Sequence, residues 1–331
     1  MTTRIAVEGC EPPMTIGAAW IRKGTNGDEL WLASDSRLSG DGNIWDDCPK
    51  LLPLPRRDAV AGFSGSTAQA YPLLIQLSNA IGWYRAAADG TLEFFHLLGH
   101  LERVANAMMN RIVPDPAITG GLLSYPEFAT SGDTLIIGGY SRAQGRLVLR
   151  SLKYLPGEHR WKFQRPPSRS SLGRDRVIVI FGDNKSVSRF RHLLNLLLEE
   201  RGILPGQTFS FEPLEILANL LQMPTSTALR MPMDRRPATI GGAPQIIRVF
   251  PGAQATAMAV QWQRHDKIAV YLQGREVFRY ENLDVPLIIF DGSYPNFYGP
   301  GHWPESAIRS QETVDENPGS TAEATAGIWS E

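Results

Sequence analysis

The segment Leu30-Trp31-Leu32-Ala33-Ser34-Asp35-Ser36-Arg37 is the most informative stretch of the chain. An apolar run ends abruptly in an acid, a hydroxyl and a base, which is typical of a buried strand that delivers polar groups at its end. A second apolar run, residues 14–21, precedes it across the turn-rich sequence RKGTNGDE. Two apolar runs around a Gly/Asn/Asp turn predict a β-hairpin.

The sequence after this hairpin adds a lysine and a glycine-rich turn. Lys50 lies fifteen positions past Asp35, directly before Leu51. A short strand is predicted over 59–63, and its continuation Gly62-Phe63-Ser64-Gly65-Ser66 leads into a helical pattern. Apolar periodicity then predicts helices over 68–84, 91–112, 186–201 and 213–221, and strands over 134–138, 146–154, 177–181, 245–250, 257–263, 268–272 and 285–290.

This order of strands, helix pair, strands, helix pair and strands predicts a layered α+β domain, because strict βαβ alternation is absent. The 331 residues suffice for a sizeable core. Lys and Arg total 33 against 34 Asp and Glu, a formal charge of −1, which argues against a nucleic-acid binder held by bulk basicity.

Composition also limits the other classes of function. Two cysteines, Cys10 and Cys48, form no CxxC pair, so neither a disulfide framework nor a zinc site is expected. No apolar run approaches the roughly 20 residues of a membrane helix, and the start lacks the apolar core of a signal peptide. We therefore expect a cytoplasmic, soluble protein without a structural zinc site, a nucleic-acid partner or a membrane partner.

The arrangement of hairpin, LASDSR, Lys50 and glycine turn resembles the proteasome β-subunit family of N-terminal-nucleophile hydrolases, and is similar to its bacterial Anbu-type members. The segments 135–140 (LIIGGY) and 239–245 (TIGGAPQ) resemble later parts of the same family pattern. The resemblance covers roughly residues 14–263, and the first third of the chain carries most of its specificity.

The resemblance implies a fold, a division of the chain and an assembly. The expected fold is a four-layer αββα sandwich of two mainly antiparallel sheets with helix pairs outside. Residues 1–13 would be a leader, 14–263 the proteasome-like domain, 264–300 a C-terminal strand extension and 301–331 a disordered tail. The family forms rings or open spirals, so a homo-oligomer is expected, and whether an unfoldase partner feeds it stays open.

The resemblance also implies a threonine-type peptidase or amide hydrolase, acting on a peptide or protein substrate without a cofactor. In that chemistry the hydroxyl of an N-terminal Thr attacks the carbonyl, and its free α-amine takes the proton. By position, Asp35 and Lys50 match the family Asp and Lys, and Gly65 matches the glycine whose N–H stabilises the oxyanion.

Two alignments of the nucleophile remain open. If Ala19 takes the place of a small family residue, Thr15 heads the strand and is the nucleophile. If Gly17 takes that place, the position of the nucleophile falls on Pro13, which has no hydroxyl, and catalysis is impossible. Thr15 is favoured, since translation from Met14 followed by its removal would expose it.

The late segments depart from the family pattern. Pro237 and Ile240 stand where the family has a second Asp and a Ser, and the nearest candidates are Asp234 and Thr239. The position of a further family serine falls near Gly182 or Asp183. These departures leave a second hypothesis, a catalytically inactive structural or interaction subunit.

Overall fold

A computed structural model of the 331-residue chain describes most of its middle. The described residues are 15–40, 43–65, 67–109, 111, 134–155, 158, 160–165, 177–204, 207–222, 240–251, 254–264, 267–278 and 280–309. The predicted leader, residues 1–13, lies outside them, as do Asp234, Pro237 and Thr239.

The larger sheet has nine strands in the order β10-β1-β2-β11-β12-β13-β14, with β15 and β16 attached through β12. Its neighbours are antiparallel except β12 and β15, which are parallel. The strands are β1 Ile16–Gly24, β2 Gly27–Ser34, β10 Ile178–Gly182, β11 Gln245–Val249, β12 Thr256–Arg264, β13 Lys267–Leu272, β14 Arg275–Glu276, β15 Leu287–Asp291 and β16 Tyr294–Tyr298.

The second sheet has five antiparallel strands in sequence order. They are β5 Leu51–Pro53, β6 Ala59–Ser64, β7 Thr134–Ser141, β8 Arg146–Leu155 and β9 Arg160–Gln164. A separate two-stranded ribbon, β3 Leu38–Gly40 and β4 Asn43–Trp45, follows the LASDSR segment. In sequence the ribbon lies between Asp35 and β5, the first strand of the second sheet.

The two faces of β2 enter different cores, because side chains alternate across a strand. Leu30 and Leu32 pack between the two sheets with Val60 of β6 and Leu149 of β8. Trp31, in contrast, packs on the opposite face, under the helices α6 (Asn184–Glu200) and α7 (Glu212–Gln222). This two-sided burial explains why residues 30–33 of the strand are all apolar.

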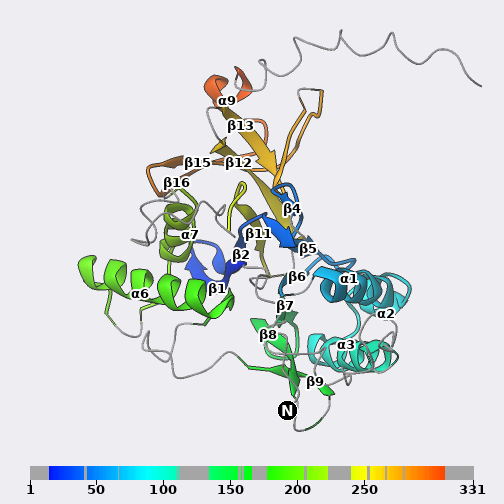
Figure 1. The fold of residues 1–331 in the computed structure, drawn as a ribbon. Coiled ribbons are helices and arrows are strands. Elements are labelled where there is room, and N and C mark those ends of the chain that lie inside the picture. The colour runs from blue at the N-terminus through cyan, green and yellow to red at the C-terminus, as the bar shows by residue number, and fades with distance from the viewer. Residues whose placement is uncertain are drawn as a thin grey trace, which may run out of the picture.

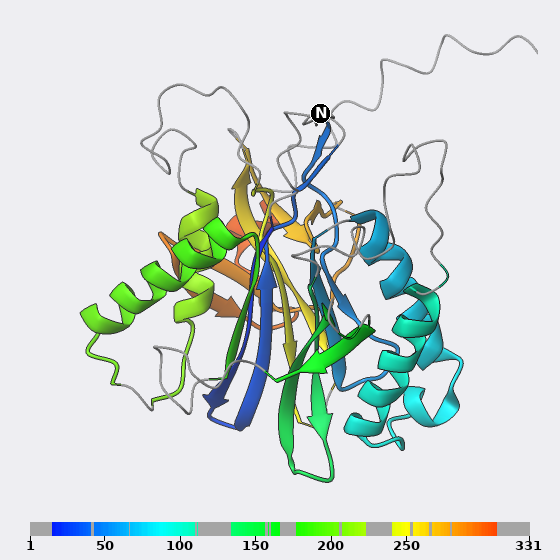
Figure 2. The same ribbon diagram turned by 60° about the horizontal axis from the view of Figure 1, so that its bottom comes forward.

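Three more helices cover the second sheet. Helices α1 (Thr67–Gly82) and α3 (Phe94–Met109), with the short α2 (Arg85–Ala88), bury an apolar face against β6, β7 and β8. Figure 2 shows both sheets between α6 and α7 on one side and α1 to α3 on the other. In the part of the chain that the structure describes, no helix is long and apolar enough to cross a membrane.

The expected four-layer αββα sandwich is wrong as a fold class, because the molecule is richer in β-structure. Of the described residues, 41% lie in strands and 29% in helices, and large antiparallel sheets dominate the architecture. The nine-residue β12 is the physical reason: it extends beyond its partner β11 and pairs with both β13 and β15. Strands beyond residue 264 thereby continue the larger sheet (Figure 1), and Ile288 of β15 packs in the core beneath α6 and α7.

The end of the chain is described only in part. Residues 305–309, within the segment predicted as a tail, form helix α9 (Glu305–Arg309), and Ala307 is buried with β12, β13 and β15 residues. Residues 310–331 lie outside the described part.

Candidate active site

Three predicted site residues come together at one end of the two facing sheets. The β1–β2 hairpin pairs Gly17 with Ser34, so Thr15, before β1, and Asp35, after β2, lie side by side. Lys50 precedes β5 and reaches them from the other sheet. Residues 15, 35 and 50 are far apart in sequence. They meet because antiparallel pairing and the packing of the two sheets bring the ends of β1, β2 and β5 to the same edge.

The Lys50 amine joins the other two side chains. Its Nζ atom lies 3.0 Å from Thr15 Oγ1 and 2.8 Å from Asp35 Oδ1. Thr15 is 3% exposed, and Asp35 and Lys50 are fully buried. A hydroxyl, an amine and a carboxylate therefore form one continuous chain shielded from bulk solvent.

The Asp35 carboxylate is fixed from three directions. Besides Lys50, its Oδ1 accepts the backbone N–H of Ile16 at 3.1 Å, and its Oδ2 accepts the N–H of Gly241 at 3.4 Å. The backbone N–H of Asp35 donates to Ile16 O at 3.1 Å. Asp35 thus holds the residue next to Thr15 and the amine that faces Thr15 at the same time.

Burial shifts both members of the ion pair toward their neutral forms. Loss of hydration lowers the pKa of Lys50 from its usual 10.5, and the attraction of Asp35 opposes this only in part. Loss of hydration likewise raises the pKa of Asp35 from 3.8, against the opposing effect of Lys50. A lysine with a lowered pKa, within hydrogen-bonding distance of a hydroxyl, can accept a proton from it.

The backbone of Thr15 is anchored to β10. Its carbonyl oxygen accepts the N–H of Asp183 at 3.2 Å, and Ile16 pairs with Gly182. Gly182 has a φ of 138°, and a Cβ atom there would lie 1.8 Å from Thr15 O. Only glycine fits this close approach, so the segment matched to a family serine instead secures the Thr15 backbone.

Gly65 lies at the same end of β6 as Lys50. The Phe63 N–H, two residues before it, donates to Lys50 O at 3.1 Å. Gly65 has a φ of 115°, in the region that favours glycine, where the chain leaves β6 for α1. Its role as an oxyanion donor stays a prediction, as does Thr15 as the nucleophile.

The late glycine turn also reaches the site, through its backbone. In addition to the Gly241 contact with Asp35, Ser36 N–H donates to Gly241 O at 3.1 Å, and Ser36 Oγ donates to Ala243 O at 2.8 Å. Ile240 is half-buried and packs on the core beneath α6 and α7. The turn supplies backbone groups where the family pattern has side chains.

One residue near the site escaped the sequence analysis. Gln245, the first residue of β11, is fully buried and its carboxamide contacts the backbone at Lys50. A single glutamine carries no motif, and no periodicity in the sequence indicates that it crosses between sheets. No group of three or more His, Cys, Asp and Glu that could hold a metal occurs among the described residues.

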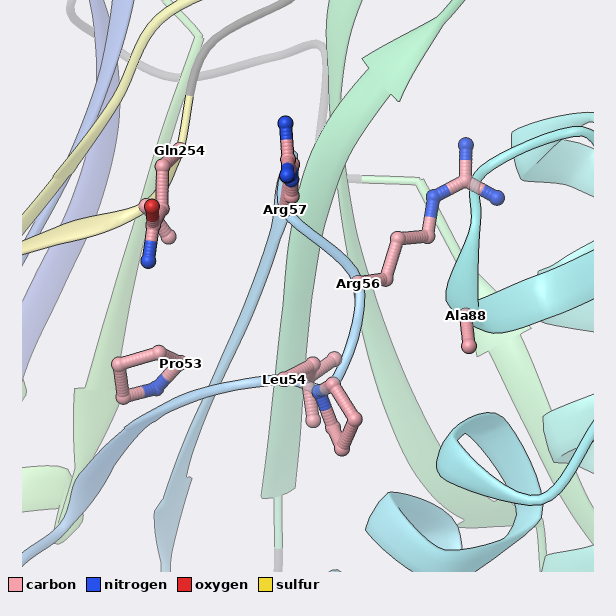
Figure 3. Close-up of a pocket in the computed structure, with 8 residues that line it drawn as sticks. Pro53, Leu54, Arg56, Arg57, Ala88 and Gln254 are labelled. Atoms are coloured by element: carbon pink, nitrogen blue, oxygen red, sulfur yellow. The ribbon is translucent and has the colours of Figure 1, made fainter. Parts of the chain in front are cut away.

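A cavity of about 220 Å³ lies elsewhere on the molecule. It is lined by the turn between β5 and β6, by Ala88 of α2 and by Gln254 (Figure 3). Since Leu51 pairs with Gly62 and Pro53 with Val60, this turn is at the far end of the hairpin from Lys50. The cavity is therefore separate from the Thr15 site.

Comparison with known proteins adds no assignment: no protein-family model and no curated protein matches the chain.

Proposed function

We propose that this chain is a threonine-type amide hydrolase, acting on peptides or proteins, with Thr15 Oγ1 as the nucleophile. The observation that supports it is the 3.0 Å separation between Thr15 Oγ1 and Lys50 Nζ, inside a buried site where Asp35 holds the amine. If the threonine were at the surface beside a solvated lysine, the lysine would have no shifted pKa and the two side chains would have no fixed geometry.

The proposed reaction follows from these three groups. Thr15 Oγ1 attacks the carbonyl carbon of an amide, and its proton passes to the neutral Lys50 amine. The Gly65 N–H stabilises the resulting oxyanion. Collapse breaks the C–N bond, the leaving amine receives the proton, and an ester on Thr15 remains, which water hydrolyses to restore the hydroxyl.

A free α-amine on Thr15 would add a second proton acceptor at the nucleophile, because an α-amine titrates near pH 7.7–8.0. We propose that the active form begins at Thr15, either by removal of the preceding residues or by translation from Met14 and loss of that methionine.

Membership of the proteasome β-subunit family, with its cytoplasmic location and its homo-oligomeric ring or spiral, is proposed on the resemblance of the sequence alone. A peptide or protein substrate follows from the same source. An unfoldase partner stays an open question within this proposal.

A second candidate function is an inactive structural or interaction subunit. The low exposure of Thr15, 3%, and the apolar Ile240 at a position where the family has a serine favour it. The two candidates differ in whether Thr15 reacts.

Labelling of the natively expressed protein with a β-lactone or epoxyketone probe tests the proposal. Intact-mass analysis should find a chain that begins at Thr15 and gains the mass of one probe. Thr15→Ala should neither label nor hydrolyse peptides, with rates lower by at least about 10³-fold, whereas Thr15→Ser should retain labelling.

Folded protein that keeps Met1 or Thr2 at its N-terminus and never labels would favour the inactive subunit. Peptide hydrolysis that persists at the same rate in Thr15→Ala would assign the activity to other residues.

A further inference from the structure

The side chain of Gln245 lies between the two sheets, at the place where Asp35 follows β2 and Lys50 precedes β5. Gln245 opens β11 and pairs with Ser34, the residue before Asp35. Its side chain is fully buried, and burial of an amide is costly unless its hydrogen-bonding groups find partners.

All of those groups have backbone partners. Oε1 accepts the N–H groups of Lys50 at 2.8 Å and Leu51 at 3.2 Å. Nε2 donates to Cys48 O at 2.5 Å and, over a longer 3.5 Å, to Asp35 O. Because a carboxamide offers two acceptor sites and two N–H donors, its capacity is filled.

These contacts secure a short edge strand of the second sheet. Strand β5 has only three residues and lies at the edge of that sheet, paired with β6 alone among the described strands. The backbone N–H groups of Lys50, just before this strand, and of Leu51, its first residue, both donate to Gln245 Oε1. The Gln245 carboxamide thereby ties the start of the strand to the larger sheet.

We infer that Gln245 is a positioning residue, which holds the backbone of Lys50 at a fixed place relative to Asp35 and so sets the distance from Lys50 Nζ to Thr15 Oγ1. Its catalytic consequence rests on the proposed function, whereas its effect on Lys50 does not. The amine needs this support because Thr15 and Asp35 belong to the larger sheet and Lys50 to the smaller one.

Gln245→Met is the main test variant, since methionine keeps the length of the side chain but neither accepts nor donates strong hydrogen bonds. Asn106→Leu is the matched control. The Asn106 carboxamide donates to Glu102 O and Trp161 O and accepts the Trp161 N–H, so it ties α3 to β9 without contact to the site.

In the natively expressed protein, Gln245→Met should lower kcat for peptide hydrolysis by about tenfold or more while KM changes little, because a displaced amine slows proton transfer without altering substrate binding. Asn106→Leu should leave kcat per folded molecule as in the wild type. Equal losses in the two variants would overturn the inference, since both would then report general destabilisation.

An NMR titration of the Lys50 side chain tests positioning without any activity. The charged and titratable groups that act on Lys50 are Asp35, Cys48 and Arg37, and none of them is altered by the substitution. In Gln245→Met the Lys50 pKa should rise toward the ordinary 10.5, because a loosened amine gains hydration. An unchanged titration, with Asn106→Leu as reference, would overturn the inference.

Gln245→Glu provides a second variant in case the methionine protein does not fold. An ionised carboxylate would face the carbonyls of Cys48 and Asp35, whereas the protonated acid can still donate to Cys48 O. Its kcat relative to the wild type should therefore increase as the pH is lowered, and a ratio independent of pH would overturn the inference. If wild-type protein neither labels nor hydrolyses, the proposed function fails and the Lys50 titration alone decides.

Discussion

The β5–β6 hairpin carries a buried ion pair at each end, and the two pairs differ in their third neighbour. At one end, Lys50 Nζ lies 2.8 Å from Asp35 Oδ1, and both side chains are fully buried. At the other, Arg56 Nε lies 2.6 Å from Asp58 Oδ1, with side-chain exposures of 1% and 10%.

The remaining contacts of Arg56 are inert. Its Nη1 donates to Leu92 O at 2.6 Å, and its guanidinium stands 5.8 Å from the ring centre of Phe94. Figure 3 shows its side chain extended toward the helical segment that carries Ala88. A guanidinium stays charged at every accessible pH, so this pair can only fix structure.

Lys50, in contrast, has a hydroxyl as its third neighbour and a pKa lowered by burial. An amine that can lose its proton beside a hydroxyl can take part in chemistry. The comparison shows that burial of an ion pair does not by itself mark an active site. Whether a buried ion pair can take part in chemistry depends on the type of cation and on the group beside it.

The largest expected effect is a difference in peptide hydrolysis between variants of the two ion pairs. Lys50→Met should lower peptide hydrolysis and probe labelling by about 10²-fold or more, because the proton acceptor is lost. Arg56→Met should leave the rate per folded molecule unchanged. Both rates are to be normalised to folded protein by circular dichroism.

Stability provides the control, because Lys50→Met and Arg56→Met should lower the free energy of unfolding by similar amounts. Each leaves a buried carboxylate without its partner, a change that costs about 3–5 kcal/mol of unfolding free energy in denaturant titration. An Arg56→Met protein as inactive as Lys50→Met would erase the distinction between the two ends.

A smaller effect is expected at the strand that anchors Thr15. Gly182→Ala should destabilise the protein by about 2–3 kcal/mol, since the new Cβ would collide with Thr15 O in a backbone conformation that favours glycine. Gly145→Ala, at a φ of 60° with open space around it, should cost only about 1 kcal/mol.

Hydrolysis measured on folded Gly182→Ala should also fall, because Thr15 moves away from Lys50. Similar stability and activity in the two alanine variants would show that the Thr15 carbonyl is not held as described.

The smallest effect is a shift in titration. Asp35→Asn removes the negative charge that favours the ammonium form of Lys50, so the Lys50 pKa should fall further in an NMR titration. Asp58→Asn should leave it unchanged. A rise of the Lys50 pKa in Asp35→Asn would contradict the electrostatic account.

The effect on stability has a definite sign. A folded pKa below the unfolded value of 10.5 means that the folded chain binds fewer protons than the unfolded chain. The contribution of Lys50 to stability is thus complete above pH 10.5 and is lost as the pH falls through the folded pKa. In Asp35→Asn that loss should extend to lower pH, as measured by unfolding at several pH values.

The sequence by itself located most of what is local. The apolar run before Asp35, the turn at RKGTNGDE and the helical periodicity of residues 68–84 and 186–201 correspond to β2, the β1–β2 turn, α1 and α6. These follow from side-chain periodicity and turn chemistry, which neighbouring residues fix. Asp35, Lys50 and Gly65 follow instead from the resemblance of the sequence to the proteasome β-subunit family.

Only the tertiary structure decided how the sheets grow and what supports the site. The pairing of β12 with β15, the backbone contacts of Gly241 and Asp183, and the bridge from Gln245 to Lys50 join residues far apart in sequence. Such contacts depend on sheet order and on the packing of one sheet against another. Local sequence carries no periodic signal for them, because their energy is gained only once distant strands have met.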